Sequence, residues 1–491
     1  MSRKKKSPPK PRGGMTMKQA LAQEASKPVL SVIDTSIPES SCRPVDVIKE
    51  LQKVADNEAG EPTTPDEVGI DGYLYTDHGN AKQFAYKYAA LVKYDHTRSK
   101  WFIWKQNWWI EDETGEVYRL TQILAEARYS AAYRVDIAKR EKAVRWALRS
   151  DSAAGIQNTI TVAKTIRPIA DSGKNWDRDA WLLGVSNGVV DLRTGELRRG
   201  KPDDRITKHS PIKYDPDAKC PRWEQAMQEI FCGDQALIDY VQCALGYCLT
   251  GDSSEDCFFI CWGDGANGKT TFIEAVMDIF GPDYSWKMPF DSLLQKKDHG
   301  IPHDIADLEG RRFVTAVESN EGAKFDMARL KEFTGGDKRN CRRLFREARN
   351  YDPTDKIWLA TNNRPEITET TDAAWRRPRL IPFLAKFAAD DPKCDKNLPD
   401  KLRAEYPGIL AWIVQGCLKW QKDGLGMPPA VKKATDEYRQ ECDHLGKFFE
   451  ECCDFSDTEA FTVSSDLRNA YSKWLGNNPE APSYAYWLPI G

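Results

Sequence analysis

A glycine-rich segment that ends in a lysine and two threonines is the strongest candidate for chemistry in this 491-residue sequence. Residues 263–270 read GDGANGKT, which matches the phosphate-loop pattern GxxxxGK[ST]. In such a loop the backbone N–H groups surround phosphates, the lysine reaches the β- and γ-phosphates, and the threonine hydroxyl binds Mg²⁺. The pattern therefore predicts a nucleoside triphosphate site with Lys269 at the phosphates and Thr270 at the metal. A chance glycine-rich turn is the alternative interpretation.

The residues expected to touch the nucleotide form one continuous stretch. They are Gly263, Asp264, Gly265, Ala266, Asn267, Gly268, Lys269, Thr270 and Thr271. The glycines let backbone N–H groups approach phosphates without Cβ clashes. The apolar run CFFICW before the loop predicts a strand, and KTTFIEAVMDIF predicts a helix whose positive N-terminus faces the phosphates. Strand, loop and helix thus occur in the order that a phosphate site requires.

Two further polar side chains follow predicted strands. The apolar residues 313–317 lead into Glu318, which we expect to bind the metal or activate water, with Glu321 as an alternative. The run KIWLAT leads into Asn362, whose amide could orient the attacking water or bind the γ-phosphate, and Asn363 is a weaker candidate. Ligands of doubly wound sheets bind where the strands end, so we expect these groups near the loop. A solvated loop acid is the alternative for Glu318.

Arg376 and Arg377 stand directly before another apolar strand. An arginine that projects into the site of a neighbouring subunit would stabilise the γ-phosphate charge in the transition state, which predicts a ring of subunits. The alternative is that one or both arginines pair with acids of the same subunit. The sequence ranks the two arginines equally.

A basic segment, TGGDKRNCRRLFREARN, lies between the second and third predicted core strands. Gly335 and Gly336 can supply a tight turn, and a loop between core strands can face the central pore of a ring, where its cations would contact a DNA backbone. The candidate DNA-binding residues are Lys338, Arg339, Arg342 and Arg343. A solvated charged face is the alternative.

The elements around these residues suggest several regions. We expect a basic tail and linker at 1–68, a mixed α/β domain at 69–215, a helical segment at 216–252, the phosphate-loop domain at 253–390 and a helical region at 391–491. Within the second region, the aromatic segment around 101–109 and residues 187–200 predict hairpins on either side of a long helical stretch at 119–166.

Composition excludes some classes of protein. Hydrophobic content is 41% and charged content 30%, and no apolar run is long enough to cross a bilayer. Thirteen cysteines without CxxC pairs indicate reduced thiols in the cytoplasm. A net charge of −3 predicts that any DNA contact is confined to local basic patches.

Taken together, the segments GDGANGKTT, VESNEG, LKEFTGGDKRNCRRLFRE, WLATNNRPEI and AWRRPRLIPF resemble, in order and spacing, the superfamily-3 helicases of phage, plasmid and poxvirus-type primase-helicases. The upstream segments TDHGNAKQFAYKY, WFIWKQNWWIED and NGVVDLRTGEL are similar to the domain that precedes the helicase in that family. The resemblance covers roughly 72–475. It implies an α/β fold with an AAA+-like P-loop ATPase core, a collar-like segment at 216–252, and a C-terminal region that could contain part of a winged helix.

Carried over to this chain, the resemblance implies ATP and Mg²⁺ at Lys269 and Thr270, the acidic strand end at Glu318, the polar sensor at Asn362, and a trans-acting arginine at Arg376 or its neighbour. It also implies a homo-hexamer that translocates on single-stranded or forked DNA. A separate primase or polymerase is a candidate partner. The expected location is the cytoplasm, that of the host cell if the protein is phage-encoded.

Two departures from the family pattern leave alternatives open. Fewer than about seventy residues precede the family-like region, too few for a polymerising primase domain, so primase activity is not expected. Ser319 and Asn320 separate Glu318 from Glu321, so either glutamate could activate water. The alternative functions are a replication initiator or loader that assembles on DNA without processive unwinding and, less favoured, a small-molecule kinase.

Two other signals have simpler explanations. His299 and His303 could suggest a metal site, but Pro302 interrupts any helix that would align them, so we expect a surface loop. The clustered tryptophans could stack on bases, but their alternation in a strand-like segment favours hairpin packing. They are Trp101, Trp104, Trp108 and Trp109.

Overall fold

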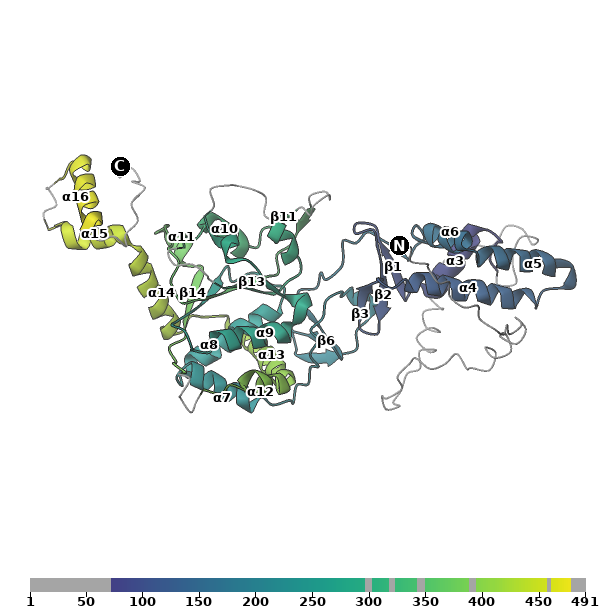
Figure 1. Cartoon of the computed structure of the whole chain (residues 1–491), viewed down its shortest axis with the longest axis horizontal. Coiled ribbons are helices and arrows are strands. Elements are labelled where there is room, and N and C mark those ends of the chain that lie inside the picture. Colours follow the sequence, from purple (N-terminus) through teal and green to yellow (C-terminus); the bar gives the residue numbers. More distant parts are fainter. Residues whose placement is uncertain are drawn as a thin grey trace, which may run out of the picture. The chain divides into compact units, whose positions relative to one another are not determined.

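The computed structural model (Figure 1) describes residues 72–295, 303–317, 323–341, 349–387, 394–456 and 461–477. The predicted tail at 1–68 lies outside these residues, as do Glu318, Glu321, Arg342, Arg343, His299 and the side chain of His303. None of the helices in the described residues combines the length and apolar composition that crossing a membrane requires.

A five-stranded parallel sheet forms the core around the phosphate loop. Its strands are β8 (Phe258–Trp262), β9 (Ser285–Lys287), β10 (Phe313–Val317), β13 (Lys356–Thr361) and β14 (Pro378–Pro382). They lie in the order β14-β8-β13-β10-β9, and every adjacent pair is parallel. Parallel sheets are buried on both faces, which explains why continuous apolar runs such as FFIC form these strands. The predicted α/β fold with an AAA+-like P-loop core is confirmed.

The two faces of this sheet are buried under different helices. Phe259 and Cys261 of β8 belong to one hydrophobic cluster, and Phe258 and Ile260 belong to the other, because successive side chains of a strand point to opposite faces. The helices of the first face are α8 (Gln235–Leu249), α9 (Lys269–Tyr284) and α13 (Tyr406–Asp423). Those of the second face are α10 (Met327–Thr334) and α14 (Pro429–Cys442). Figure 1 shows α10 on one side of β13 and α9 on the other.

Helices from before and after the sheet share one hydrophobic core. They are α7 (Pro221–Ile230), α8, α12 (Leu398–Ala404) and α13. A Cβ at Gly246 of α8 would lie 2.0 Å from the backbone nitrogen of Cys417, and one at Gly416 of α13 would lie 2.0 Å from the carbonyl oxygen of Gln242. The two helix backbones therefore touch at paired glycines. The segment at 216–252 is thus packed together with part of 391–491, a long-range pairing that the sequence pattern does not reveal.

The region before this core contains two small sheets and a layer of helices. The helices are α3 (Asp77–Tyr88), α4 (Glu116–Ala132), α5 (Ile137–Ser150), α6 (Ala153–Ala163) and the 3-10 turn η1 (Pro202–Asp204). The first sheet has the order β3-β2-β1-β4 and contains β1 (Val92–Asp95), β2 (Lys100–Lys105), β3 (Trp108–Glu111) and β4 (Ala170–Asp171). The second contains β5 (Leu182–Val185), β6 (Gly188–Asp191) and β7 (Glu196–Arg198). Both predicted hairpins are confirmed, as β2 with β3 and β6 with β7, whereas the stretch 119–166 is divided among three helices.

The clustered tryptophans pack inside this region, as predicted. Trp109 is fully buried and lies edge-on to Trp176, with ring centroids 5.7 Å apart. Trp108 stacks on His209 at 4.1 Å, and Trp101 contacts Tyr94 at 5.0 Å. These rings form protein contacts rather than an exposed surface for bases.

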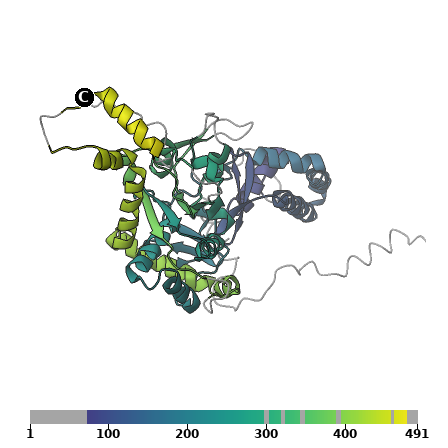
Figure 2. The ribbon, with the colours of Figure 1, turned by 60° about the vertical axis from the view of Figure 1, so that its left-hand side comes forward.

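Three helices come last among the described residues, and the first of them packs on edge strand β14. They are α14, α15 (His444–Cys452) and α16 (Ser464–Asn477). In α14, Thr435 accepts a hydrogen bond from the backbone nitrogen of Leu380 in edge strand β14, at 3.1 Å, so the helix covers that edge (Figures 1 and 2). Between 394 and 477 the described residues form helices without a strand, so the predicted partial winged helix has no hairpin there. The remaining short helices are η2 (Phe290–Leu293), η3 (His303–Leu308) and α11 (Asp372–Trp375).

Candidate functional site

The predicted phosphate loop connects β8 to α9, as its sequence requires. Strand β8 ends at Trp262, and α9 begins at Lys269, with Gly268 as its N-cap residue. The first backbone N–H groups of a helix have no intrahelical partner, and the helix dipole places partial positive charge at the same end. The loop therefore has the geometry of an anion site at a helix N-terminus.

Two of the three loop glycines are required by the loop's own conformation. Gly268 has φ +86°, and a Cβ there would lie 2.9 Å from Ile230. A Cβ at Gly263 would lie 2.2 Å from the carbonyl oxygen of Phe383. At Gly265 a Cβ would meet no atom within 4 Å, so the fold itself does not demand that glycine. Ala266 adopts φ +58°, which is unusual for a residue with a side chain.

The segment that follows β14 holds the loop in place. The backbone nitrogen of Phe383 donates to the carbonyl of Trp262 at 2.7 Å, and Asn267 Nδ2 donates to the carbonyl of Phe383 at 3.1 Å. The backbone nitrogen of Phe387 donates to the carbonyl of Ala266 at 2.7 Å. Sequence reasoning missed this contact, because it joins residues more than a hundred positions apart. The loop is thereby fixed to the edge strand of the sheet.

Lys269 and Asn362 meet at the carboxyl edge of the sheet. Lys269 Nζ donates to Asn362 Oδ1 at 3.0 Å and also to the carbonyls of Asp264, at 3.2 Å, and Gly263. Asn362 follows β13, which pairs directly with β8. Lys269 is only 7% exposed, and burial lowers the pKa of its ammonium. The structure thus brings together the lysine of the predicted phosphate loop and the amide that the sequence predicted near that loop.

The other predicted ligands of this edge differ in exposure. Thr270 is exposed in the first turn of α9, while Thr271 is half-buried. Asn363 is exposed, and its carbonyl accepts a hydrogen bond from Thr361. Glu318 and Glu321 lie outside the described residues, and β10, which precedes them, ends at Val317 opposite Ala360 of β13. The Mg²⁺ ligands therefore stay predictions.

Arg376 and Arg377 lie at the opposite edge of the sheet from Lys269. They directly precede β14, which runs parallel to β8 with Pro378 opposite Phe258. A five-residue strand spans about 13 Å, so these arginines cannot share an edge with the loop of their own chain. Arg376 is exposed, whereas Arg377 is half-buried and donates to Thr334 Oγ1 at 3.1 Å and to the Ala373 carbonyl at 2.5 Å. The structure thereby separates two arginines that the sequence ranked equally.

The basic segment forms a hairpin whose base is anchored by a buried ion pair. Its strands are β11 (Arg339–Cys341) and β12 (Arg349–Tyr351). The side chains of Arg339 and Asp355 are 1% and 0% exposed, and their charged atoms are 2.7 Å apart. Arg339 therefore holds the hairpin to the core and does not present a cation to solvent, which differs from the predicted DNA contact. Lys338 is exposed and lies 3.6 Å from Asp352, while Arg342 and Arg343 lie outside the described residues.

Arg364 is a residue near the site that sequence reasoning missed. Its guanidinium lies 3.8 Å from the ring centroid of Trp262, the last residue before the phosphate loop. Its side chain is 11% exposed and forms an ion pair with Glu441 of α14. Its place two residues after Asn362 is the only local signal, because Glu441 is distant in the sequence. Helix α14 therefore contacts the loop that carries Asn362.

Two family models match different parts of the chain. Residues 81–232 match the family described as D5 N terminal like, and residues 261–377 match a family of unknown function (DUF5906). The second match includes the phosphate loop, Asn362 and both arginines.

Several named relatives come from viruses. The chain is 27% identical over 448 residues to a provisionally named helicase of Acanthamoeba polyphaga mimivirus, which covers 83% of this chain and 46% of that protein. It is 25% identical over 337 residues to a provisionally named helicase of Invertebrate iridescent virus 3, covering 62% and 36%. A provisionally named primase of African swine fever virus is 24% identical over 326 residues, covering 62% and 34%. The chain thus spans between about a third and a half of the length of these relatives.

Among solved structures, the apo form of the NrS-1 C-terminal region matches with a TM-score of 0.44 and 12% identity, covering 78% of this chain and 82% of that chain.

Proposed function

We infer that this chain is an ATP-dependent DNA helicase of the ring-forming type, similar to the superfamily-3 primase-helicases, from its family match and its viral relatives. A helicase or primase role in DNA replication is the part of this statement that rests on the relatives. ATP hydrolysis at subunit interfaces, the homo-hexamer, translocation on single-stranded DNA and action in the cytoplasm are the parts that we propose. The observation that carries the proposal is the contact between Lys269 and Asn362.

The contact supports an ATP site because of where its two residues come from. Lys269 begins the helix that follows the phosphate loop, and Asn362 follows the adjacent parallel strand, so a γ-phosphate held by the loop would meet both. Mg²⁺ would neutralise developing charge, with Thr270 and Glu318 as its expected ligands. Asn362 would orient the attacking water, and Glu318 or Glu321 would accept its proton.

The position of Arg376 supports an assembly of several subunits. An exposed arginine at the edge opposite its own loop can reach a γ-phosphate only in a neighbouring chain. Arg377, which already donates to two groups of its own chain, suits a structural role better. We therefore propose Arg376 as the trans-acting arginine.

The hairpin of β11 and β12 supports a DNA contact through the other cations of the basic segment. The buried pair of Arg339 and Asp355 fixes its base, which leaves Lys338, Arg342 and Arg343 as the proposed phosphate contacts. DNA binding at this hairpin would couple movement along a strand to the core that binds ATP.

Steady-state ATP hydrolysis with and without single-stranded DNA tests this function. We expect hydrolysis that DNA stimulates and that Lys269→Ala abolishes, whereas Lys432→Ala, on the exposed face of α14, leaves it unchanged. If DNA does not stimulate ATP hydrolysis by the unaltered protein, the helicase proposal is contradicted. A small-molecule kinase would then be the alternative to test. ATP-dependent assembly on DNA with no strand separation would instead identify an initiator or loader.

A further inference from the structure

The hairpin of helices α4 and α5 carries a concentration of positive charge that the proposed function does not use. Helices α4 and α5 pack side by side (Figure 1). Helix α5 contains one acid, Glu141, and five cations, in a chain whose net charge is −3. The cations of α5 are Lys139, Arg140, Lys142, Arg145 and Arg149. Such an imbalance attracts an anionic partner, because the excess positive charge creates a positive potential around the helix. A bound anion would also reduce the repulsion between like charges on the helix.

Several of these cations share the exposed side of α5. Lys142, Arg145 and Arg149 are exposed, and their spacing of three and four residues places them along one side of the helix. The adjacent side of the helix is buried through Trp146 and Ala147. The Arg149 guanidinium lies 5.3 Å from the Trp146 ring, which limits its motion. Glu141 forms an ion pair with Arg145, at 2.5 Å.

Large apolar and aromatic side chains are exposed on the same hairpin. Tyr133, at the end of α4, is 57% exposed, and Tyr129 one turn earlier is 38% exposed. Ile137 and Leu148 of α5 are 84% and 58% exposed. Exposed aromatic rings beside cations are the combination on which single-stranded nucleic acids bind, because bases stack on rings while phosphates pair with Lys and Arg. Duplex DNA offers phosphates but not free base faces.

We propose that the exposed side chains of the α4–α5 hairpin bind single-stranded DNA as a second contact, separate from the hairpin of β11 and β12. This inference rests on the proposed function in one respect, namely that DNA is the polymer on which the protein acts. The charge fits the phosphate backbone, and Tyr133, next to Arg134 in the chain, fits a base. The contact would hold a strand independently of ATP, since no residue of the hairpin belongs to the candidate ATP site.

Fluorescence anisotropy of a labelled oligodeoxythymidylate, without nucleotide and at several salt concentrations, tests the inference with the full chain. The double variant Lys142→Gln, Arg149→Gln removes two exposed cations of α5. Each phosphate contact on a single strand contributes a slope of about −0.7 in log K against log salt, so the slope should become shallower by about 1.4. Tyr133→Ser should weaken binding about fivefold or more with the slope unchanged, because stacking is not ionic.

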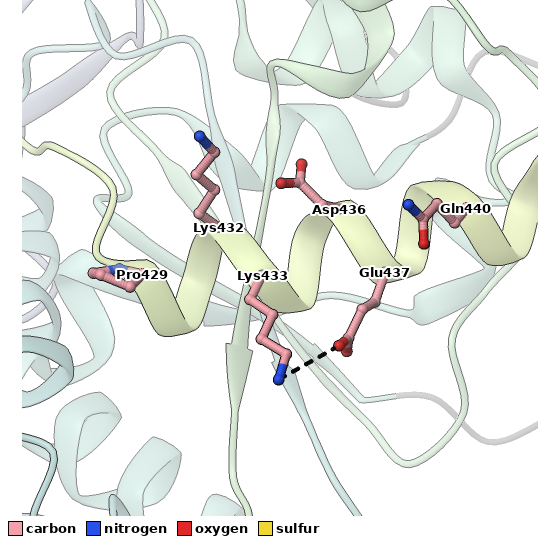
Figure 3. Close-up of a pocket in the computed structure, with 6 residues that line it drawn as sticks. All are labelled: Pro429, Lys432, Lys433, Asp436, Glu437 and Gln440. Carbon is pink, nitrogen blue, oxygen red and sulfur yellow. Dashed lines mark ion pairs between the residues drawn. The ribbon is translucent and has the colours of Figure 1, made fainter.

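The matched control is Lys432→Gln, Lys433→Gln on α14, which changes the net charge of the chain by the same amount. These lysines lie on the exposed face of α14 with Asp436 and Glu437, and Lys433 pairs with Glu437 at 3.9 Å (Figure 3). This control should keep the slope of the unaltered protein, and all variants should keep its melting temperature.

Equal slopes in the two double variants would overturn the inference, and an acidic protein would then be the partner to test. Absence of ATP hydrolysis in the unaltered protein would refute the proposed function. The comparison of salt slopes between the two double variants would remain valid.

Discussion

The ring of Tyr438 lies edge-on against Trp375, with centroids 5.2 Å apart, while its hydroxyl donates to the carbonyl of Pro365. Pro365 lies three residues after Asn362, and Trp375 directly precedes Arg376. Helix α14 therefore joins the loop of the proposed γ-phosphate sensor to the segment of the proposed trans-acting arginine. In a ring, those two groups would serve consecutive ATP sites.

Tyr438→Phe should lower kcat for ATP hydrolysis about tenfold with little change in KM. The variant keeps the ring against Trp375 but leaves the Pro365 carbonyl without this donor, a loss of about 1–3 kcal/mol in a buried setting. Lys269 and its loop keep their own contacts, so ground-state binding should persist. Steady-state kinetics, together with the Hill coefficient for ATP, measures the effect.

Tyr214→Phe is the matched control for this variant. The Tyr214 hydroxyl also donates to a backbone carbonyl, that of Gly195 directly before β7, at 3.0 Å, in a buried position. Both variants should lose similar stability, but only Tyr438→Phe should change kcat and the Hill coefficient. If the two variants have the same kinetics, Tyr438 has only a structural role.

Arg376→Ala should lower ATP hydrolysis about a thousandfold while ATP binding persists. Mixing Arg376→Ala subunits with inactive Lys269→Ala subunits should restore part of the activity, because the second subunit supplies the arginine to the intact loop of the first. Arg377→Ala should instead lower stability, since its side chain donates to Thr334 and Ala373. A mixture as inactive as its components would contradict the proposed action in trans.

Arg339→Ala should destabilise the fold by about 3–5 kcal/mol, because it leaves Asp355 charged, buried and without its partner. Urea unfolding measures the loss. Lys338→Ala, at the exposed neighbouring position, should change stability by about 0.5 kcal/mol or less. Replacing both partners, as in Arg339→Met with Asp355→Leu, should recover much of the loss. Equal stability of the two single variants would show that the ion pair does not anchor the hairpin.

Lys356 gives a prediction about pH. Burial lowers the pKa of its ammonium from 10.5 to about 8, although it donates to the Thr250 carbonyl at 2.6 Å. Between these values the unfolded chain binds this proton and the folded chain does not, so folding stability rises with pH there. Relative to Lys356→Met, the free energy of unfolding should therefore increase between about pH 8 and 10.5, by about 1 kcal/mol per unit. A pH-independent difference between the two proteins would contradict this.

The parts of the site that sequence predicted are those encoded locally. The loop from Gly263 to Lys269 has a fixed spacing, and its flanking strand and helix are continuous patterns of one element each. Asn362 was found because a polar residue at the end of an apolar strand must lie at the sheet edge where parallel strands end. These inferences need no knowledge of which distant residues touch.

The parts that sequence missed depend on long-range contacts. Nothing in the run DKRNCRR distinguishes Arg339 from its neighbours, and its burial is decided by Asp355, sixteen residues away. Likewise, Gly246 and Gly416 are ordinary helical glycines until α8 and α13 pack against each other. The contacts of α14 with Arg364 and Pro365 belong to the same class. Each of these contacts depends on which helices and strands pack together. The sequence pattern predicts the individual elements but not which of them are in contact.

Unwinding of a forked DNA duplex by the unaltered protein and by Lys269→Ala tests the central claim most directly. With ATP and Mg²⁺, the unaltered protein should separate the strands, and Lys269→Ala should not, because its phosphate loop lacks the cation that meets Asn362. Strand separation by Lys269→Ala equal to that of the unaltered protein would contradict the assignment of this loop as the site that drives unwinding.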